Sequence, residues 1–363
     1  MKIHLMDPGL LARAGHHFDL DLKLARWLVQ AGHQLHVYAH AQVAAEVLQA
    51  FQPVAQVTPL FRAPTYYDPR RYDHSAGELV AYMNHSRVLA QNLQSVPAAD
   101  AWLWPTITAS QLHACAATAR NVPVAGCVHT EARTLLHPHG DMWWRHALLA
   151  AHGAGMRLRL GAMEQEMRFD YQPLMEQGVF ECWPHYFDGV TAAAPRQQLR
   201  RIGFFGHQRS EKGVALIPAL VKALAERGFD VVVQDSLQHF GQGLGPRVTV
   251  LGFVENMTES IATCDLVVLP YEPESYRRKA SGVLLDALAS GVPVVAPFGT
   301  LPGRWIDSTG AGTQFIRADA AHILQAVESA HNNFGTIAEA AAQTARDWRS
   351  RYGVARFAQA LLG

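Results

Sequence analysis

The sequence predicts an α/β protein built from two doubly wound domains, each a parallel sheet covered by helices. Two observations indicate this class. Short apolar runs of strand length alternate with helix-period segments along most of the chain, which is the pattern of parallel βαβ units. The chain also has 363 residues, more than one hydrophobic core usually organises. We therefore expect two domains of about 150 to 190 residues each.

The composition is that of an ordered globular protein without a charge imbalance. Hydrophobic residues make up 49% of the chain and charged residues 17%, and 31 Lys and Arg balance 31 Asp and Glu. This balance gives no reason to expect a nucleic-acid partner. The N-terminal apolar run is too short for a signal peptide, and no segment reaches the roughly 20 apolar residues of a membrane span. We therefore expect a cytoplasmic protein.

The four cysteines are spread along the chain, and each stands among apolar residues. No CxxC pair occurs, and His and Cys show no zinc-finger spacing. We therefore expect buried thiols, with no structural metal and no cofactor. The four residues are Cys115, Cys127, Cys182 and Cys264.

The first half opens with a βαβ unit. An apolar run at 3–6 predicts a strand, Gly15 marks a turn before a helix-period pattern that Gly32 closes, and 35–40 predicts a second strand. Similar alternation continues, so we expect residues 1–185 to form the first domain. The remaining predicted elements are strands at 101–104 and 122–127 and helices over 75–93 and 110–120.

The segment 137–176 interrupts this alternation. Its stretches WWRH, RLRL and MEQEMRF predict helices that carry aromatic and arginine side chains, so we interpret the segment as an insertion or lid. It could hold a ligand, such as a glycan or a lipid-linked molecule, or contact a membrane surface. A helical excursion with buried tryptophans is an equal alternative. The side chains concerned are Trp143, Trp144, Arg145, Arg157 and Arg159.

A second domain is expected from 186 to 345. A short strand within 182–189 gives way to Pro and Gly, and a polar stretch leads into a new strand. The last helices have an apolar stripe and no strand after them, so we expect 346–363 to pack back toward the first domain. The elements predicted in the second domain are strands at 202–205, 231–233, 248–251, 266–270 and 293–296 and helices over 214–228 and 281–290.

The most informative stretch is SGVLLDALASGVPVVAPFGT at 281–300. Ser281 and Gly282 begin a helix, and small residues let a phosphate approach the N–H groups and positive dipole of a helix start. Asp286 lies about one turn further on and is placed to accept hydrogen bonds from ribose hydroxyls. The alternative is that Ser281 only caps the helix and that Asp286 is a solvated carboxylate.

A second cluster lies in the loop GFFGHQRSEKG at 203–213. The loop follows a predicted strand and is bounded by glycines, and it carries Arg209 and Lys212. Two cations suit the neutralisation of a diphosphate leaving group. Ligands of open α/β sheets bind beyond the carboxyl ends of strands, where both clusters fall, although solvated surface charge is the alternative.

These two stretches together resemble the donor half of retaining GT-B glycosyltransferases, of the group 1 or family 4 type. The resemblance implies two Rossmann-like domains that face a central cleft, with the nucleotide-sugar donor bound by the second. It implies that the chain is a transferase and that the first domain receives the acceptor. The residues implied to bind the donor are Arg209, Lys212, Ser281, Gly282, Val283 and Asp286.

The chain departs from the family's Glu-x7-Glu motif. Asp286 stands at its final position, and Arg278, of opposite charge, stands at its first. Glu274, in the loop YEPESYRRK, is a candidate to take the catalytic place of that first Glu. An exposed loop carboxylate without a role is the alternative.

The first half resembles the same family at three strand ends. Gly15 follows the first strand, where the resemblance implies contact with the donor phosphate, and His16 and His17 are implied on the acceptor side. His129 follows the strand in VAGCVHTEAR and is implied to contact the donor sugar as the catalytic residue of this half. Trp104 ends another strand and is expected to line the acceptor side. Capping, surface or core positions are the alternatives.

The expected reaction is transfer of a sugar from a nucleotide-diphosphate donor to a hydroxyl of a glycan, lipid-linked or small-molecule acceptor, with retention implied by the resemblance. The Asp19-Leu20-Asp21 triplet lies in a predicted helix, where its carboxylates diverge by roughly 200°, so we expect no metal. Two alternatives stay open: a nucleotide-sugar epimerase and a degenerate nucleotide-sugar-binding protein. We expect a cytoplasmic location, with peripheral contact at the inner face of the membrane as a further alternative.

Overall fold

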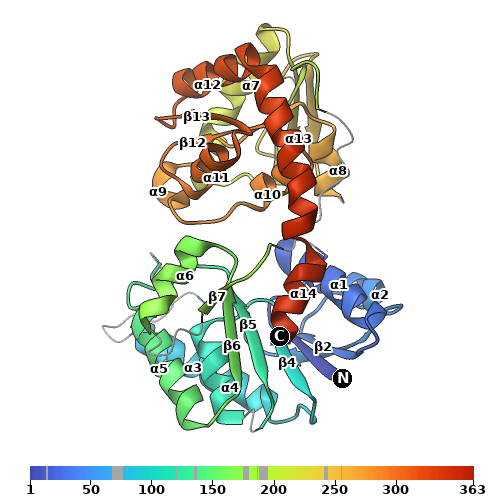
Figure 1. The fold of residues 1–363 in the computed structure, drawn as a ribbon, viewed down its shortest axis with the longest axis vertical. Helices are drawn as coiled ribbons and strands as arrows, with labels where there is room; N and C mark the ends of the chain where they lie inside the picture. The colour runs from blue at the N-terminus through green and yellow to red at the C-terminus, as the bar shows by residue number, and fades with distance from the viewer. Residues whose placement is uncertain are drawn as a thin grey trace. The chain divides into compact units, whose positions relative to one another are not determined.

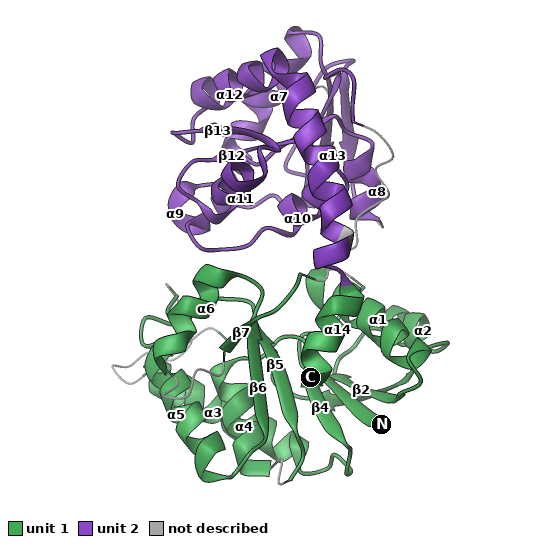
Figure 2. Cartoon of the chain, in the orientation of Figure 1, with its two compact units in different colours: residues 1–186, 354–363 green, residues 187–353 purple. Residues whose placement is uncertain are grey.

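The chain folds into two units, which we describe separately (Figure 2). Unit 1 comprises residues 1–186 and 354–363, and unit 2 comprises 187–353. The computed structural model describes residues 1–13, 15–67, 77–118, 121–134, 137–174, 180–185, 187, 195–240, 244–254 and 256–363. Parts of the helices predicted over 75–93 and 110–120 and of the strand predicted within 182–189 lie outside these ranges. No helix among the described residues is both long and apolar enough to cross a membrane.

Unit 1 contains a parallel sheet of seven strands in the order β3-β2-β1-β4-β5-β6-β7 (Figure 1). The strands are rich in buried apolar side chains because helices cover the sheet. The order reverses beside β1, and such a switch point is where open α/β sheets bind ligands. The strands are β1 Lys2–Asp7, β2 Gln34–His40, β3 Gln56–Phe61, β4 Ala101–Trp104, β5 Val124–Val128, β6 Leu158–Ala162 and β7 Phe180–Cys182.

The helices of unit 1 follow its strands, and the C-terminal helix joins them. Helix α14 contacts α1 and β5, and its Phe357 ring lies 6.3 Å from Trp183. Helices α3, α4 and α5 pack on one another in sequence order. The bounds are α1 Gly15–Gln30, α2 Ala45–Phe51, α3 Gly77–Leu93, α4 Ala109–Thr118, α5 Gly140–Gly153, α6 Gln165–Tyr171 and α14 Val354–Leu362.

The prediction of an insertion at 137–176 is wrong. The segment forms α5, β6 and α6, and β6 pairs in parallel with β5 and β7, so the alternation continues. The RLRL stretch, predicted as helix, contributes to β6, and its alternation of polar and apolar residues has the period of a strand. Of the predicted buried thiols, Cys182 is exposed because it ends β7, the edge strand, whereas Cys115, Cys127 and Cys264 are buried.

Among its described residues, unit 2 contains a parallel sheet of six strands in the order β10-β9-β8-β11-β12-β13. Two apolar clusters pack with its side chains, one including α10 and α13 and the other α7 and α12. The strands are β8 Arg201–Phe204, β9 Asp230–Gln234, β10 Val248–Leu251, β11 Leu266–Val268, β12 Val294–Pro297 and β13 Gly312–Phe315.

The helices of unit 2 complete the βα alternation. Helix α10 is apolar around nearly its whole circumference and is buried from Val283 to Ala289, so its start is held firmly at the strand ends. The helices are α7 Ile217–Glu226, α8 Met257–Ala262, α9 Pro273–Tyr276, α10 Gly282–Ala289, α11 Leu301–Thr309, α12 Ala320–Asn332 and α13 Phe334–Arg351, with a short 3-10 turn at Ser210–Lys212.

Candidate functional site

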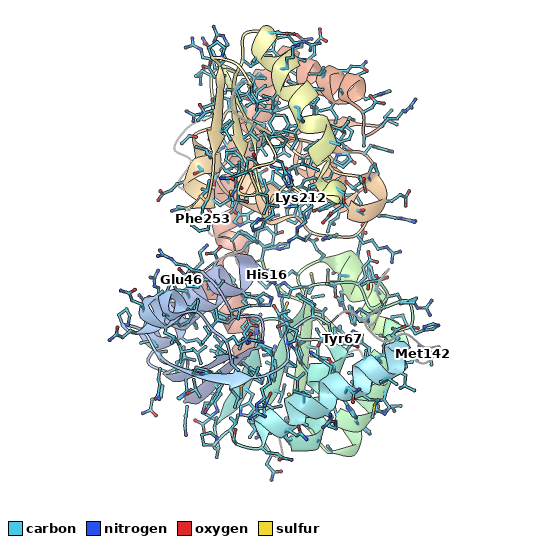
Figure 3. The ribbon with its side chains drawn as sticks, turned by 180° about the vertical axis from the view of Figure 1, so that it is seen from behind. His16, Glu46, Tyr67, Met142, Lys212 and Phe253 are labelled. Atoms are coloured by element: carbon cyan, nitrogen blue, oxygen red, sulfur yellow. The ribbon has the colours of Figure 1, made fainter. Side chains whose placement is uncertain are left out.

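In unit 2, the side chain of Lys212 lies against the loop that follows β8 (Figure 3). Gly206 has a φ of 91°, and a Cβ atom there would lie 2.7 Å from the Lys212 Nζ and 3.2 Å from Val283 Cγ2. The bare backbone of Gly206 therefore leaves room for the ammonium group beside the start of α10. Gly213 closes the loop with a φ of 73°, and a Cβ there would collide with the carbonyl of Pro270.

The charge of Lys212 lacks full compensation within unit 2. Burial, together with the charges of Arg209 and Lys279, lowers the pKa of Lys212 to about 8, and Glu211 opposes this only in part. The Nζ atom lies 5.6 Å from the centre of the Tyr271 ring, at cation–π distance. A bound anion would relieve the repulsion among these cations, so the lysine is poised to bind a negatively charged group.

The start of α10 lies next to this lysine. Ser281 caps the helix by accepting a hydrogen bond of 3.3 Å from the Leu284 N–H, and its Oγ is 3.1 Å from the Tyr271 hydroxyl. Tyr271 thus touches both the lysine and the cap. Gly282 is exposed at the first helical position. The structure therefore brings Lys212, Ser281, Gly282 and Val283 together at the carboxyl ends of β8 and β11.

The other residues predicted in unit 2 are placed less directly. Asp286 is buried, and its Oδ1 accepts a hydrogen bond of 2.8 Å from Thr258 Oγ1. Arg209 is exposed, with one guanidinium nitrogen 3.8 Å from Glu211. Glu274 lies exposed on the short helix α9, and Arg278 is also exposed. Across the described part of unit 2, no hydrogen bond or ion pair joins Glu274 to Lys212.

In unit 1, a buried carboxylate ends β1. Asp7 is fully buried and accepts hydrogen bonds from the Gly9 N–H at 2.6 Å and the Thr65 hydroxyl at 3.3 Å. The His17 Nδ1 lies 2.7 Å from its other oxygen. Burial alone would lower the pKa of His17, but the charge and hydrogen bond of Asp7 outweigh it and raise this pKa. Asp7 therefore fixes the ring of His17 and favours its protonated form.

Asp21, on α1, has its carboxyl group beside that of Asp7. Burial and the charge of Asp7 raise the pKa of Asp21 well above its ordinary value, whereas His17 helps to lower that of Asp7. Of these two acids, Asp21 therefore binds a proton more readily than Asp7. Asp19, two residues earlier, is exposed, so the two acids of the Asp-x-Asp triplet diverge as predicted.

His16 and His129 meet at the same edge of unit 1. Their ring centres are 5.5 Å apart with the ring planes inclined by 26°, and the ring centre of His16 lies 4.0 Å from that of His17. Burial, followed by neighbouring histidine charge, lowers the pKa of His16 to about 3. Burial likewise lowers that of His129 to about 4, although the Pro105 carbonyl opposes it. Both rings are therefore neutral at neutral pH.

The proton of His129 is placed by the backbone. Its Nε2 is 2.8 Å from the Pro105 carbonyl oxygen, which can only accept, so Nε2 carries the hydrogen and Nδ1 is the acceptor nitrogen. Gly15 begins α1 with a φ of 78°, a conformation that favours glycine. The structure therefore gathers the predicted Gly15, His16, His17 and His129 at the ends of β1 and β5.

Trp104 does not join this group. Its side chain is fully buried in the core of unit 1, where its ring centre lies 5.8 Å from that of Phe61. The expectation that Trp104 lines an acceptor surface is therefore wrong, because strand β4 is covered and its indole serves packing. Sequence reasoning also missed Asp7 and Tyr271. Asp7 could have been found as the acid that ends the first strand, but Tyr271 carries no comparable signal.

The comparisons with known proteins cover both units. Residues 200–333 match the family model described as glycosyl transferases group 1. HepE of Anabaena, in complex with UDP and glucose, is 18% identical with a TM-score of 0.67 over 99% of this chain and 97% of that one. The glycotransferase of kitacinnamycin is 13% identical with a TM-score of 0.66 over 99% of each chain. None of the curated protein sequences matches this chain.

The third structure compared is a sucrose-phosphate synthase from Thermosynechococcus elongatus, at 13% identity and a TM-score of 0.66 over 99% of this chain and 96% of that one. At such identities the structures show the fold alone, and they confirm the predicted GT-B class of two Rossmann-like units. The family match confirms the prediction of a transferase. Residues 200–333 thus match the model of group 1 glycosyl transferases, and the whole chain shares the fold of the solved glycosyltransferases.

Proposed function

We propose that this chain transfers a sugar from a nucleotide-diphosphate donor held by unit 2 to a hydroxyl of an acceptor held by unit 1. One observation carries the proposal. The ammonium of Lys212 and the capped start of α10 meet at the carboxyl ends of β8 and β11, within the group 1 glycosyl transferase domain. HepE has been crystallised with UDP-glucose, which supports a nucleoside diphosphate sugar as the donor class.

The donor diphosphate is assigned to Lys212, to Arg209 and to the N–H groups at Ser281, Gly282 and Val283. Charge on the departing diphosphate grows as the bond to the sugar breaks, and a positioned cation and a helix start stabilise it most at that moment. This supports departure of the nucleotide without a metal ion. Asp286 is assigned to the ribose hydroxyls, alongside its hydrogen bond with Thr258.

The sugar and the acceptor are assigned to the strand ends of unit 1. Neutral His129, with its proton on Nε2, is proposed to contact the donor sugar, and Gly15 to contact the donor phosphate. His16 and His17 are placed on the acceptor side. Glu274 keeps its proposed catalytic role, supported by its position on the short helix α9, which follows β11.

We propose retention of the anomeric configuration, in line with the family that the two loops resemble. In that course the acceptor proton leaves on the departing diphosphate. The Asp7–His17 pair favours inversion as a second candidate, because a histidine oriented by a buried carboxylate is the usual arrangement of a general base. The anomeric configuration of the product, measured by NMR, separates the two.

The test is incubation of the full chain with radiolabelled UDP-, GDP- and ADP-sugars, with and without glycan, lipid-linked and phenolic acceptors. Sugar transfer, or slow donor hydrolysis when no acceptor is present, supports the proposal. Conversion of one nucleotide sugar into another would assign the chain as an epimerase. Donor binding with no turnover under any condition would make it a binding protein. Assays with EDTA and with added Mg²⁺ test the proposed independence of metal.

A further inference from the structure

Helices α3 and α5 of unit 1 carry large apolar side chains that face solvent. Both helices supply the core on one side of the sheet, whereas α1 and α2 lie on the other side (Figure 1). The exposed positions of α3 recur every four residues from 79 to 91, so they form one stripe along the helix. This stripe begins with Leu79, 44% exposed, and Met83, 43% exposed. On α5, Met142 and Leu149 are 53% and 71% exposed and lie about two turns apart.

Contacts between the two helices hold these side chains on one rigid surface. The Trp143 indole of α5 donates a hydrogen bond of 2.6 Å to Glu78 of α3, and its ring stacks on that of Tyr82 at 5.1 Å. The Tyr82 hydroxyl lies 3.0 Å from the His146 Nδ1. The first turns of the two helices therefore lie side by side and run in the same direction. We define the α3–α5 surface as Leu79, Met83, Arg87, Met142, Arg145 and Leu149.

The exposed charges of α3 and α5 have one sign. Arg87 and Arg145 are exposed, and no Asp or Glu occupies an exposed position of either helix, both of which the structure describes in full. Each helix has a single acid, and other side chains hold it. Glu78 accepts the indole hydrogen bond, and Asp141 accepts one of 2.6 Å from Arg133. The surface thus combines apolar side chains with cations.

The other side of unit 1 has a different composition. The exposed positions of α1 include Asp19 and Arg26, and those of α2 include Glu46, so charges of both signs occur there. Met142 and Glu46 lie at opposite sides of unit 1 (Figure 3). Helices that lie at the surface of an anionic membrane combine apolar side chains with Lys and Arg. Only the side formed by α3 and α5 has this composition among the helices compared.

We propose that the α3–α5 surface binds an anionic lipid membrane. Its four apolar side chains enter the boundary between headgroups and acyl chains, and Arg87 and Arg145 pair with lipid phosphates. The two helices expose ten residues, fewer than the roughly 20 to 30 that one side of a stable protein interface uses. A lipid surface needs no matching shape, which favours it over a protein partner. None of the residues assigned above to donor or acceptor lies on α3 or α5, so the inference is independent of the proposed function.

The experiment is cosedimentation of the full chain with phosphatidylcholine vesicles that contain or lack phosphatidylglycerol. Binding to the anionic vesicles is expected, and it weakens as the salt concentration rises. Leu149→Glu places a carboxylate in the surface at a position where folding is little affected, and it is expected to weaken binding about tenfold. Val29→Glu makes the same kind of change at an exposed position near the end of α1, so it is the matched control and leaves binding unchanged.

A second pair of variants tests the charges. Arg145→Glu is expected to weaken binding about tenfold, whereas Arg26→Glu, with the same change in net charge on α1, weakens it less than about twofold. Thermal unfolding of each variant shows whether it folds like the wild type.

Three outcomes overturn the inference. The first is equal binding to vesicles with and without phosphatidylglycerol. The second is an equal loss of binding within each pair of variants, which would show that net charge alone decides binding. The third is self-association that Leu149→Glu abolishes in a chain that binds no vesicles, which would assign the surface to a second copy of the chain.

Discussion

The two units have parallel sheets of the same type, but different side chains lie at the carboxyl ends of their strands. In unit 1 the carboxyl ends of β1 and β5 hold His16, His17 and His129 around the buried Asp7. In unit 2 the ends of β8 and β11 hold Lys212 and a helix start flanked by small residues. The shared fold decides where a ligand binds, and the side chains decide which ligand it is.

Burial lowers the pKa of basic groups at both edges, with different consequences. It leaves His16 and His129 neutral, because their pKa values fall to about 3 and about 4. It lowers the pKa of Lys212 to about 8, so most of that side chain stays charged at pH 7. The edge of unit 1 therefore carries two neutral imidazole rings, whereas the edge of unit 2 carries a cation, in line with the acceptor and diphosphate sites proposed above.

The largest expected effect is the loss of stability that follows replacement of Asp7 in unit 1. Asp7→Ala removes the partner of a buried ion pair and leaves His17 and Thr65 without their acceptor, which costs about 4 kcal/mol of stability. Unfolding in urea, followed by hydrogen exchange of peptides from unit 1, measures this loss. Asp19→Ala, which removes an exposed acid from α1, the helix that carries His17, is the control and changes stability by less than about 0.5 kcal/mol. Equal effects of the two substitutions would contradict the structural role of Asp7.

In unit 2, the stability of the loop after β8 depends instead on the close approach of the Gly213 backbone to the Pro270 carbonyl. Gly213→Ala strains a positive φ and drives a methyl group into the Pro270 carbonyl, so we expect a loss of about 3 kcal/mol. At Gly228 a Cβ would meet nothing within 4 Å, so Gly228→Ala carries the φ strain alone, about 1 kcal/mol. The same exchange measurement on unit 2 peptides compares them. Similar losses would show that the loop can move away from Pro270.

Much of this comparison could be predicted from the sequence, and the reason lies in local patterns. Glycines and predicted strand ends mark both the capped helix at Ser281 and the loop around Lys212. In each case the signal lies within 20 consecutive residues. The contacts of Tyr271 with Lys212 and of Thr65 with Asp7 join residues 58 or more positions apart, which no local pattern encodes. The sequence does not predict strand β6, because arginines at this spacing also suit the surface of a helix, although the alternation of polar and apolar residues is that of a strand.

A smaller effect is the pH dependence of nucleotide binding by unit 2. Because the pKa of Lys212 is lowered to about 8, its charge is present below that pH and is lost above it. Affinity for a nucleoside diphosphate should fall about twofold between pH 7 and 8 and then by up to about tenfold per pH unit. Binding curves at pH 7, 8 and 9 for the wild type and Lys212→Met measure this. An equal fall in the variant would assign the titration to another group.

The smallest expected effect concerns the cap of α10. Ser281→Ala removes the hydroxyl that accepts from the Leu284 N–H, at a cost of about 1 kcal/mol of stability in unit 2. Ser281→Asn retains a capping oxygen and should recover most of that loss. Thermal unfolding of both variants, with and without UDP, is the measurement. No difference between the Ala and Asn variants would show that the Ser281 hydroxyl does not stabilise the helix start.

The claim that unit 2 binds the donor through Lys212 is tested most directly by calorimetric titration of UDP, GDP and ADP into the wild type and Lys212→Met. Lys222→Met, which removes an exposed lysine from α7 in the same unit, is the control. At least one nucleotide should bind the wild type and the control equally and the Lys212 variant about 100-fold more weakly. Unchanged affinity in Lys212→Met would contradict the assignment of this loop to the donor diphosphate.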